Sequence, residues 1–369
     1  MDPFAGLPWF ILRDILSSLP DLFSLHSLYN ASPGIATFLR ENNAQFAQIT
    51  DAIMARPSRD RGLMPYIRDM LRLLVLLWSR QSNGTDAAHS YTEILESISR
   101  IRKQGPYQSL PVVNALPPST PSALLFRLLA LVTRLQPIAH SFFHTMIDRC
   151  LKLSIEQLPL GNGEIQMEEQ RILGSLLCVV FFYDLRTAHA QSLGISEISR
   201  CEEVLLTNNV EEFWHAHGFG DGSQLEQLGS LLLWLDEQAG GRDHVWSWMR
   251  SPADLEKDGD CCQQYTLTTD DQTEWDETDP ESMYGEARVY RRLFHCRISN
   301  LSPIKRVQLS YFRPYGVMFW ETARLQALGF TVKGLPTLMW FAFSSIFSEQ
   351  DWEDLVRRQR AWRQQHPNH

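Results

Sequence analysis

The chain is organised around the stretch LPWFILRDILSSLPDLFSL, which occupies residues 7–25. The apolar residues at positions 11, 12, 15, 16 and 19 follow one face of a helix over two turns. Pro20 is expected to end that helix, because its ring nitrogen carries no hydrogen to donate. Asp21 can then cap a second helix, with Leu22, Leu25 and Leu28 on its apolar side.

A third short helix is predicted directly downstream. Ser32 followed by Pro33 is typical of an N-cap with proline at the first helical position, and Ile35, Phe38 and Leu39 supply the apolar side. Three helices this short cannot bury much apolar surface by themselves. We therefore expect part of their surface to pack against a partner.

These residues resemble a known family. The Leu-Pro, the two Ile-Leu pairs, the Leu-Pro-Asp-Leu and the Ala-Ser-Pro within the first 45 residues are similar to the F-box of fungal F-box proteins. Two positions differ from the common pattern. Phe10 stands where an acidic residue often follows the Leu-Pro, and Phe38 is the nearest residue in kind to a tryptophan that many F-boxes carry near their end.

The resemblance implies a fold, a partner and an interface. An F-box docks on the Skp-type adaptor of a cullin–RING (SCF-type) ubiquitin ligase, so it implies a substrate-receptor subunit without catalytic residues, cofactor or metal of its own. The protein substrate stays open. The residues expected to contact the adaptor as buried anchors are Leu7, Pro8, Ile11, Leu12, Ile15, Leu16, Leu19, Pro20, Leu22 and Leu25.

A second stretch, FRPYGVMFWE at residues 312–321, is similar to a Gly-Tyr-Val-Phe-Trp-Asp run found late in many fungal F-box proteins. Here the order is Tyr-Gly-Val-Met-Phe-Trp-Glu. Independently of that likeness, Gly316 permits a tight turn, and the apolar run from Val317 to Trp320 is expected to pack.

Composition limits the classes of function. The chain has 369 residues, is 44% hydrophobic and carries a net charge of −9. Eleven acidic residues and one lysine lie within residues 254–281, so the acidity is local and we expect an acidic loop there. No basic stripe suits nucleic acid, and no secretory signal, apolar run of about 18 residues or Cys-x-x-Cys pair is present. These features favour a cytoplasmic or nuclear protein that neither enters a membrane nor binds nucleic acid.

The remainder of the chain predicts an all-α fold, with an F-box-like domain at residues 1–50 and a large irregular helical domain at residues 63–369. A proline-rich connection at 105–121 is one candidate boundary within the second domain. Helical periodicity or capping signals are found in the following segments: 43–53 with Asn43 as cap, 67–78, 91–101, 122–135, 138–153, 166–191 as a central buried helix, 197–206, 209–216, 223–235 with a Ser223/Glu226 capping box, 283–296, 319–328, 337–347 and 349–364.

Several clusters leave other functions open. His140, His144 and Asp148 share a helix face, which suits a metal site or a solvated face. His215 and His217 precede a glycine-rich turn. A basic partner could bind the acidic loop, and the arginines of the last segment could meet that loop within the chain. Six tryptophans could line a cleft or fill the core, namely Trp214, Trp234, Trp246, Trp248, Trp320 and Trp340.

Two alternatives to the ligase receptor follow from these patterns. One is an F-box-bearing scaffold that binds proteins outside any ligase. The other is a helical enzyme, which would need a pocket where His140, His144 and Asp148 converge.

Overall fold

The computed structural model of the chain describes residues 2–56, 62–83, 115–153, 165–191, 209–216, 222–251 and 309–320, together with Ile94 and seven residues between 350 and 365. The described residues contain helices and no strand, which confirms the all-α prediction. The predicted segments 197–206, 254–281, 283–296 and 337–347 lie outside the described residues, as do most of 91–101, 105–121, 319–328 and 349–364.

The amino-terminal helices form as the capping signals predict. α1 (Trp9–Ser18), α2 (Leu22–Ala31), α3 (Pro33–Glu41) and α4 (Asn43–Met54) follow one another with short turns. Asp21 Oδ1 accepts a hydrogen bond from the amide of Ser24 at 2.7 Å, and Ser32 Oγ accepts one from the amide of Ile35 at 3.1 Å. Each cap therefore satisfies an amide that the helix itself leaves unpaired.

Asn43 does not cap α4, so that prediction is wrong. α4 begins at Asn43, its N-cap residue is Asn42, and neither side chain bonds the first amides of the helix. Asn42 Nδ2 instead donates to the carbonyl of Phe38 at 2.8 Å and closes the end of α3. The side chain of Asn42 therefore serves the end of α3 and not the start of α4.

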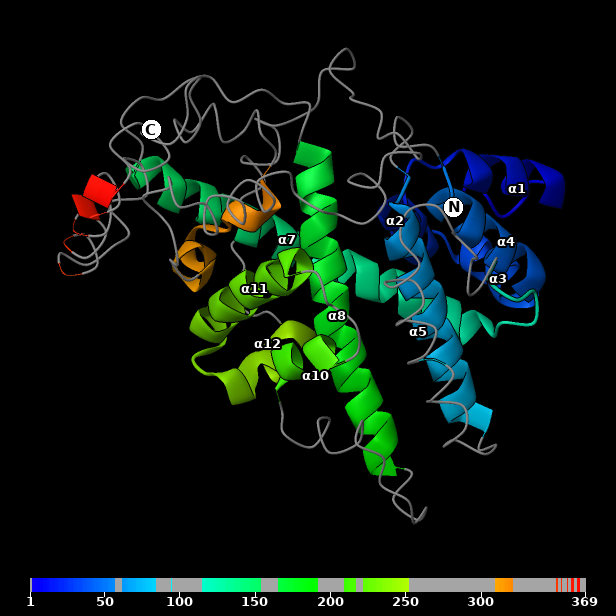
Figure 1. Cartoon of the computed structure of the whole chain (residues 1–369). Helices are drawn as coiled ribbons and strands as arrows, with labels where there is room; N and C mark the ends of the chain where they lie inside the picture. The colour runs from blue at the N-terminus through cyan, green and yellow to red at the C-terminus, as the bar shows by residue number, and fades with distance from the viewer. Residues whose placement is uncertain are drawn as a thin grey trace.

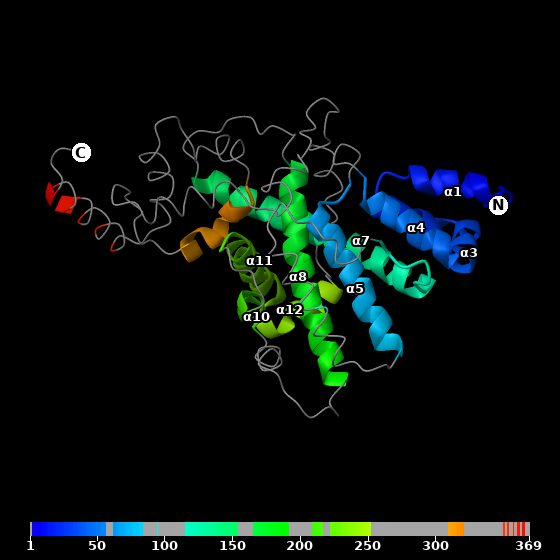
Figure 2. The ribbon, with the colours of Figure 1, turned by 45° about the vertical axis from the view of Figure 1, so that its right-hand side comes forward.

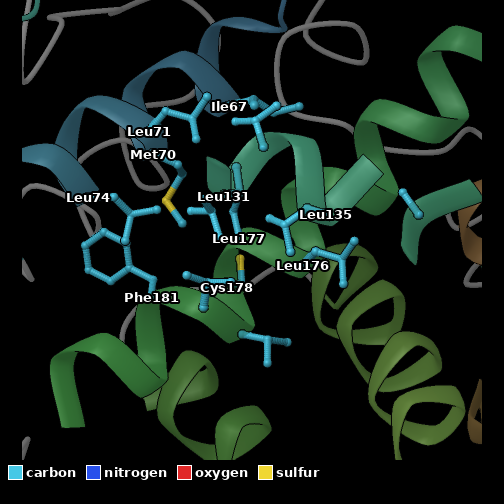
Figure 3. Close-up of a cluster of buried hydrophobic side chains, with 14 of the residues drawn as sticks. Ile67, Met70, Leu71, Leu74, Leu131, Leu135, Leu176, Leu177, Cys178 and Phe181 are labelled. Atoms are coloured by element: carbon cyan, nitrogen blue, oxygen red, sulfur yellow. The ribbon is translucent and has the colours of Figure 1, made fainter. Parts of the chain in front are cut away.

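α8 (Ile165–Gln191) is the central helix, with α5 (Pro65–Asn83) on one side and α11 (Ser223–Ala239) on the other (Figures 1 and 2). α7 (Ser122–Leu153) crosses it, and α10 (Val210–Ala216), η2 (Arg242–His244) and α12 (Val245–Arg250) complete the side nearer α11. Residues Leu176–Phe182 of α8 are buried all round, as the sequence predicts for a central helix. Figure 3 shows Leu71, Leu131 and Leu177 meeting where α5, α7 and α8 pack together.

α7 is one continuous helix of 32 residues, whereas the sequence predicts two helices divided near Pro137. A proline inside a helix removes one backbone hydrogen bond. The flanking turns are held by buried Leu135, Ile138 and Phe142, so tertiary packing outweighs the local penalty. Within Ser122–Cys150 an 18-residue stretch has a mean hydropathy of 1.3, which is apolar enough for a membrane span, but 44% of that stretch is buried here, and core helices can be equally apolar.

The first fifty residues pack directly against the rest of the protein. α2, α3 and α4 all contact α7, and one hydrophobic core runs from Leu12 to Trp320. Asp51 near the end of α4 joins two further segments. It accepts two hydrogen bonds from Arg72 of α5, at 2.8 and 3.0 Å, and one from the amide of Leu116, which is buried. The last residues of the proline-rich connection therefore lie against the core.

The late segment η3 (Leu309–Tyr315) and η4 (Val317–Phe319) packs onto α11, α7 and α8. Gly316 between them adopts a φ of 60°, as the predicted tight turn requires, and Val317–Trp320 are fully buried. Arg171 of α8 donates to the carbonyl of Phe319 at 3.0 Å, and Gln227 of α11 donates to that of Met318 at 2.8 Å. Glu321 lies outside the described residues.

The capping box predicted at the start of α11 is wrong. The N-cap residue is Gly222, and no side chain bonds the first amides. Glu226 is instead occupied by Arg313 of η3, whose Nε donates to Glu226 Oε2 at 2.7 Å. Arg313 Nη2 also donates to Glu226 Oε1 at 3.3 Å, so both carboxylate oxygens are held by the guanidinium and neither bonds the cap.

Replacing Gly174 by alanine should lower the free energy of unfolding by about 1–3 kcal/mol. A Cβ at this position of α8 would lie 2.4 Å from the hydroxyl oxygen and 2.6 Å from a ring carbon of buried Tyr66. Denaturant unfolding measures the change. Adding Tyr66→Ala removes the obstacle, so the double variant should lose less than the sum of the two single losses. Helix propensity alone predicts that Gly174→Ala stabilises the protein. Such a result would contradict the close contact with Tyr66.

Candidate docking surface

The large apolar side chains that face solvent are concentrated at the amino terminus. Seven such residues are exposed in the described part of the chain, and five of them lie before or within α1 and α2. Trp9 is 55% exposed and is the most open of all seven. Several exposed apolar side chains on neighbouring helices are the kind of surface on which interaction sites form, whereas single ones are ordinary. The five residues, called the amino-terminal patch below, are Leu7, Trp9, Phe10, Ile11 and Phe23.

The residues predicted to contact an adaptor divide into three groups. Leu7, Pro8, Ile11 and Pro20 are exposed, and Ile15 and Leu19 are half-buried. The other four predicted residues, Leu12, Leu16, Leu22 and Leu25, are buried in the core of this chain, at 6% exposure or less.

The structure therefore divides the residues of α1 between two roles, which are packing in the core and exposure to a partner. The inner side of α1 holds the fold together through Leu12 and Leu16. The outer side of α1 faces solvent, so a partner can reach it there. Sequence reasoning assigned both sides to the adaptor, because a period of 3.6 identifies an apolar face without saying what covers it.

Sequence reasoning missed Trp9, Phe10 and Phe23 as surface residues. For Phe10 the available signal was its position. Phe10 is two residues from buried Leu12, which places it on the opposite side of α1. The rings of Trp9 and Phe10 meet edge to face with centroids 6.1 Å apart, and the guanidinium of Arg13 lies 5.5 Å from the Trp9 ring centroid. Arg13 also pairs with Asp14 at 3.3 Å, so charged groups border the patch.

α1 is held in place at its end by Arg56. The guanidinium of Arg56 donates hydrogen bonds to the carbonyls of Ser17 and Leu19, which lie at the last residues of α1 and its C-cap. α1 also packs directly against α4. Because the carbonyls at a helix end have no partner within the helix, these bonds fix α1 against the start of the linker that follows α4. The amino-terminal patch is thereby presented on a fixed helix.

The histidine cluster forms a pair and not a triad. His140 Nε2 and His144 Nε2 are 2.9 Å apart, and His140 Nδ1 lies 3.4 Å from Glu169 Oε1 of α8. Asp148 is exposed and does not join them. Among the described residues, no group of three His, Cys, Asp or Glu side chains is arranged to hold a metal ion. His215 is exposed at the end of α10, and His217 lies outside the described residues.

The tryptophans belong mostly to the core. Trp214, Trp234 and Trp320 have no exposed surface, and Trp246 and Trp248 are half-buried against the core. The ring of Trp246 stacks on that of Tyr183 with centroids 4.9 Å apart. Of the six tryptophans considered for a cleft, Trp340 lies outside the described residues. The five described ones pack in the core or against it.

Comparison with known proteins adds no relative: no family model, no curated protein and no solved structure matches this chain.

Proposed function

We propose that this protein is a substrate-receptor subunit of an SCF-type cullin–RING ubiquitin ligase, which binds the Skp-type adaptor through α1 and α2. The observation that carries the proposal is the amino-terminal patch, which coincides with the stretch whose residues resemble an F-box. The large helical domain at residues 63–369 would hold the protein substrate. The conjugating enzyme and its thioester would belong to other subunits.

The chemical role that follows from this proposal is positional. A receptor that holds a target near a loaded conjugating enzyme raises the local concentration of the target lysine. It needs no nucleophile, metal or cofactor. The rigid attachment of α1 to Arg56 and α4 supports such a role, because an anchored docking helix loses little conformational entropy on binding.

The core leucines cannot serve as test positions for this interface. Introducing a charge at Leu12 or Leu16 would disrupt the fold, since both side chains are buried within the chain. The loss of adaptor binding in such a variant would report unfolding. Exposed members of the amino-terminal patch avoid this ambiguity.

Truncating Trp9 and Phe23 together to alanine should weaken binding of a purified Skp-type adaptor at least 30-fold, which corresponds to about 2 kcal/mol for loss of apolar anchors. The measurement is a titration of the full chain with the adaptor. Because both side chains are exposed, the thermal midpoint should change little.

The matched control is Leu233→Ala, which truncates an exposed apolar residue on α11. It should leave adaptor affinity unchanged. The proposal fails if the Trp9/Phe23 double variant binds the adaptor as the native chain does, or if the native chain does not bind it. Binding of the adaptor without recruitment of a cullin would favour the scaffold alternative.

A further inference from the structure

The carboxylate of Asp2 joins residues 2–7, called the leading segment below, to the start of α3. Asp2 Oδ2 accepts hydrogen bonds from the amide of Gly34 at 2.6 Å and from the hydroxyl of Ser32 at 2.8 Å. Asp2 Oδ1 accepts one from the amide of Phe4 at 2.9 Å, within the leading segment itself. One side chain therefore connects parts of the chain that lie 30 and 32 positions apart.

The contact uses a backbone group that α3 leaves unpaired. Gly34 is the second residue of α3, and the amides in the first turn of a helix have no partner within the helix. A negative charge at this end is also favoured by the helix dipole. The pKa of Asp2 is lowered, chiefly by the bond from the Gly34 amide and then by that from Phe4. The carboxylate is therefore ionised near neutral pH, where the contact is complete.

The backbone of the leading segment lies directly on α3 at Gly34. A Cβ at Gly34 would be 3.0 Å from Asp2 Oδ2, 3.1 Å from Ala5 Cα and 3.2 Å from the Ala5 nitrogen. The leading segment is itself folded, because the amide of Ala5 donates to the carbonyl of Asp2 and that of Leu7 to the carbonyl of Phe4. Phe4 also packs against the core. The leading segment is thus a short folded piece held on the first turn of α3.

α1 begins without a side-chain cap. Its N-cap residue is Pro8, which makes no capping hydrogen bond, and no acidic residue lies in its first turn. Trp9 and Phe10, the first two residues of α1, belong to the amino-terminal patch. Arg56 fixes the other end of α1, whereas the leading segment continues directly into this one. The position of the two rings therefore depends on how the leading segment is held.

We propose that Asp2 is a positioning residue for the docking surface, because it fastens the leading segment to α3 and so fixes Leu7, Trp9 and Phe10 in the arrangement that contacts the adaptor. This inference rests on the proposed function, which supplies the adaptor as the partner. A surface that is fixed before binding loses less conformational freedom when the partner binds. Asp2 acts through the residues of the patch and does not itself contact the adaptor.

The first test titrates the full-length Asp2→Ala variant with the purified Skp-type adaptor. Affinity should fall about tenfold, since the variant must order the leading segment as it binds. The thermal midpoint should change little, because Asp2 is not part of the buried core. Asp2→Asn keeps one acceptor oxygen and should lose less affinity. The matched control is Glu41→Ala, which removes a carboxylate at the exposed last residue of α3 and should bind as the native chain does.

Gly34→Ala disturbs the same contact from the side of α3 while the carboxylate stays in place. Its Cβ would displace Asp2 or Ala5, so this variant should also weaken adaptor binding. Because both changes act on one contact, the double variant Asp2→Ala/Gly34→Ala should lose less affinity than the product of the two single losses. A purely structural role for Asp2 would instead lower the thermal midpoint and leave the affinity of the folded chain unchanged.

Hydrogen exchange of the full chain without adaptor tests the attachment alone. Peptides that contain the amides of Phe4 and Gly34 should exchange faster in Asp2→Ala than in the native chain, whereas peptides from α7 should not change. The inference is overturned if this exchange is unaltered, or if the native chain binds the adaptor and both single variants bind it equally well. A native chain that does not bind the adaptor refutes the proposed function, and this role of Asp2 with it, whatever the exchange shows.

Discussion

Replacing Trp320 by alanine is expected to lower the free energy of unfolding by about 3–5 kcal/mol, the range for truncating a fully buried tryptophan. The side chain has no exposed surface, and its ring meets Phe143 of α7 edge to face with centroids 5.5 Å apart. Trp320 Nε1 also donates to the carbonyl of Tyr315 at 3.1 Å, which closes the turn around Gly316. The substitution therefore leaves a cavity and removes one of the two hydrogen bonds to this carbonyl, the other being donated by the thiol of Cys150 at 3.3 Å.

Urea unfolding followed by circular dichroism measures this loss. The matched control is Trp9→Ala, which makes the same chemical change at a position that is 55% exposed and should alter stability by less than about 0.5 kcal/mol. Equal losses in the two variants would contradict the buried placement of Trp320. A large loss in Trp9→Ala alone would show that the amino-terminal patch belongs to the core.

Replacing Arg313 by methionine should cost about 2–4 kcal/mol, somewhat below the range for breaking a fully buried ion pair, because the arginine side chain is 19% exposed. Arg313 Nη2 donates to Glu211 Oε1 of α10 at 2.6 Å, while Nε bonds Glu226 of α11. Burial acts to lower the pKa of Arg313, but the two glutamates raise it above its ordinary value. Methionine keeps most of the volume and leaves the two carboxylates to repel each other.

Two further variants separate charge from packing. Adding Glu211→Gln to Arg313→Met removes one of the two carboxylates left without their arginine, and should restore part of the lost stability. Arg13→Met is the matched control, because Arg13 forms an exposed pair with Asp14 that contributes little. If Arg313→Met is no more harmful than Arg13→Met, the bridge between α10, α11 and η3 does not stabilise the fold.

The local parts of this fold could be predicted from the sequence. The caps at Asp21 and Ser32, the stripe from Ile67 to Trp78 and the central helix follow from residues within a few positions of one another. Such signals are encoded in short stretches, so they are visible without tertiary information. Pro137 shows the limit, because the packing that keeps α7 continuous comes from distant segments.

The wrong capping box of α11 has a long-range cause, unlike the wrong cap of α4, which depends on a neighbouring residue. Glu226 has the right spacing for a capping box, but its partner Arg313 is 87 residues away. Gly229 also depends on the distant residue Arg313. A Cβ there would lie 2.4 Å from Arg313 Cζ, although no local signal marks a need for glycine. Periodicity also cannot tell which side of α1 a neighbour covers, so the sequence alone does not separate buried Leu12 and Leu16 from exposed Leu7 and Ile11.

The position of residues 309–320 has a consequence for protein synthesis. Arg149 of α7 bonds the carbonyl of Pro314 across 165 positions of the chain, and Arg171 bonds that of Phe319 across 148. α7, α8 and α11 therefore leave the ribosome well before the segment that covers their shared apolar surface. Nascent chains halted before residue 309 should expose that surface and bind chaperones, whereas chains extended well beyond residue 320 should release them.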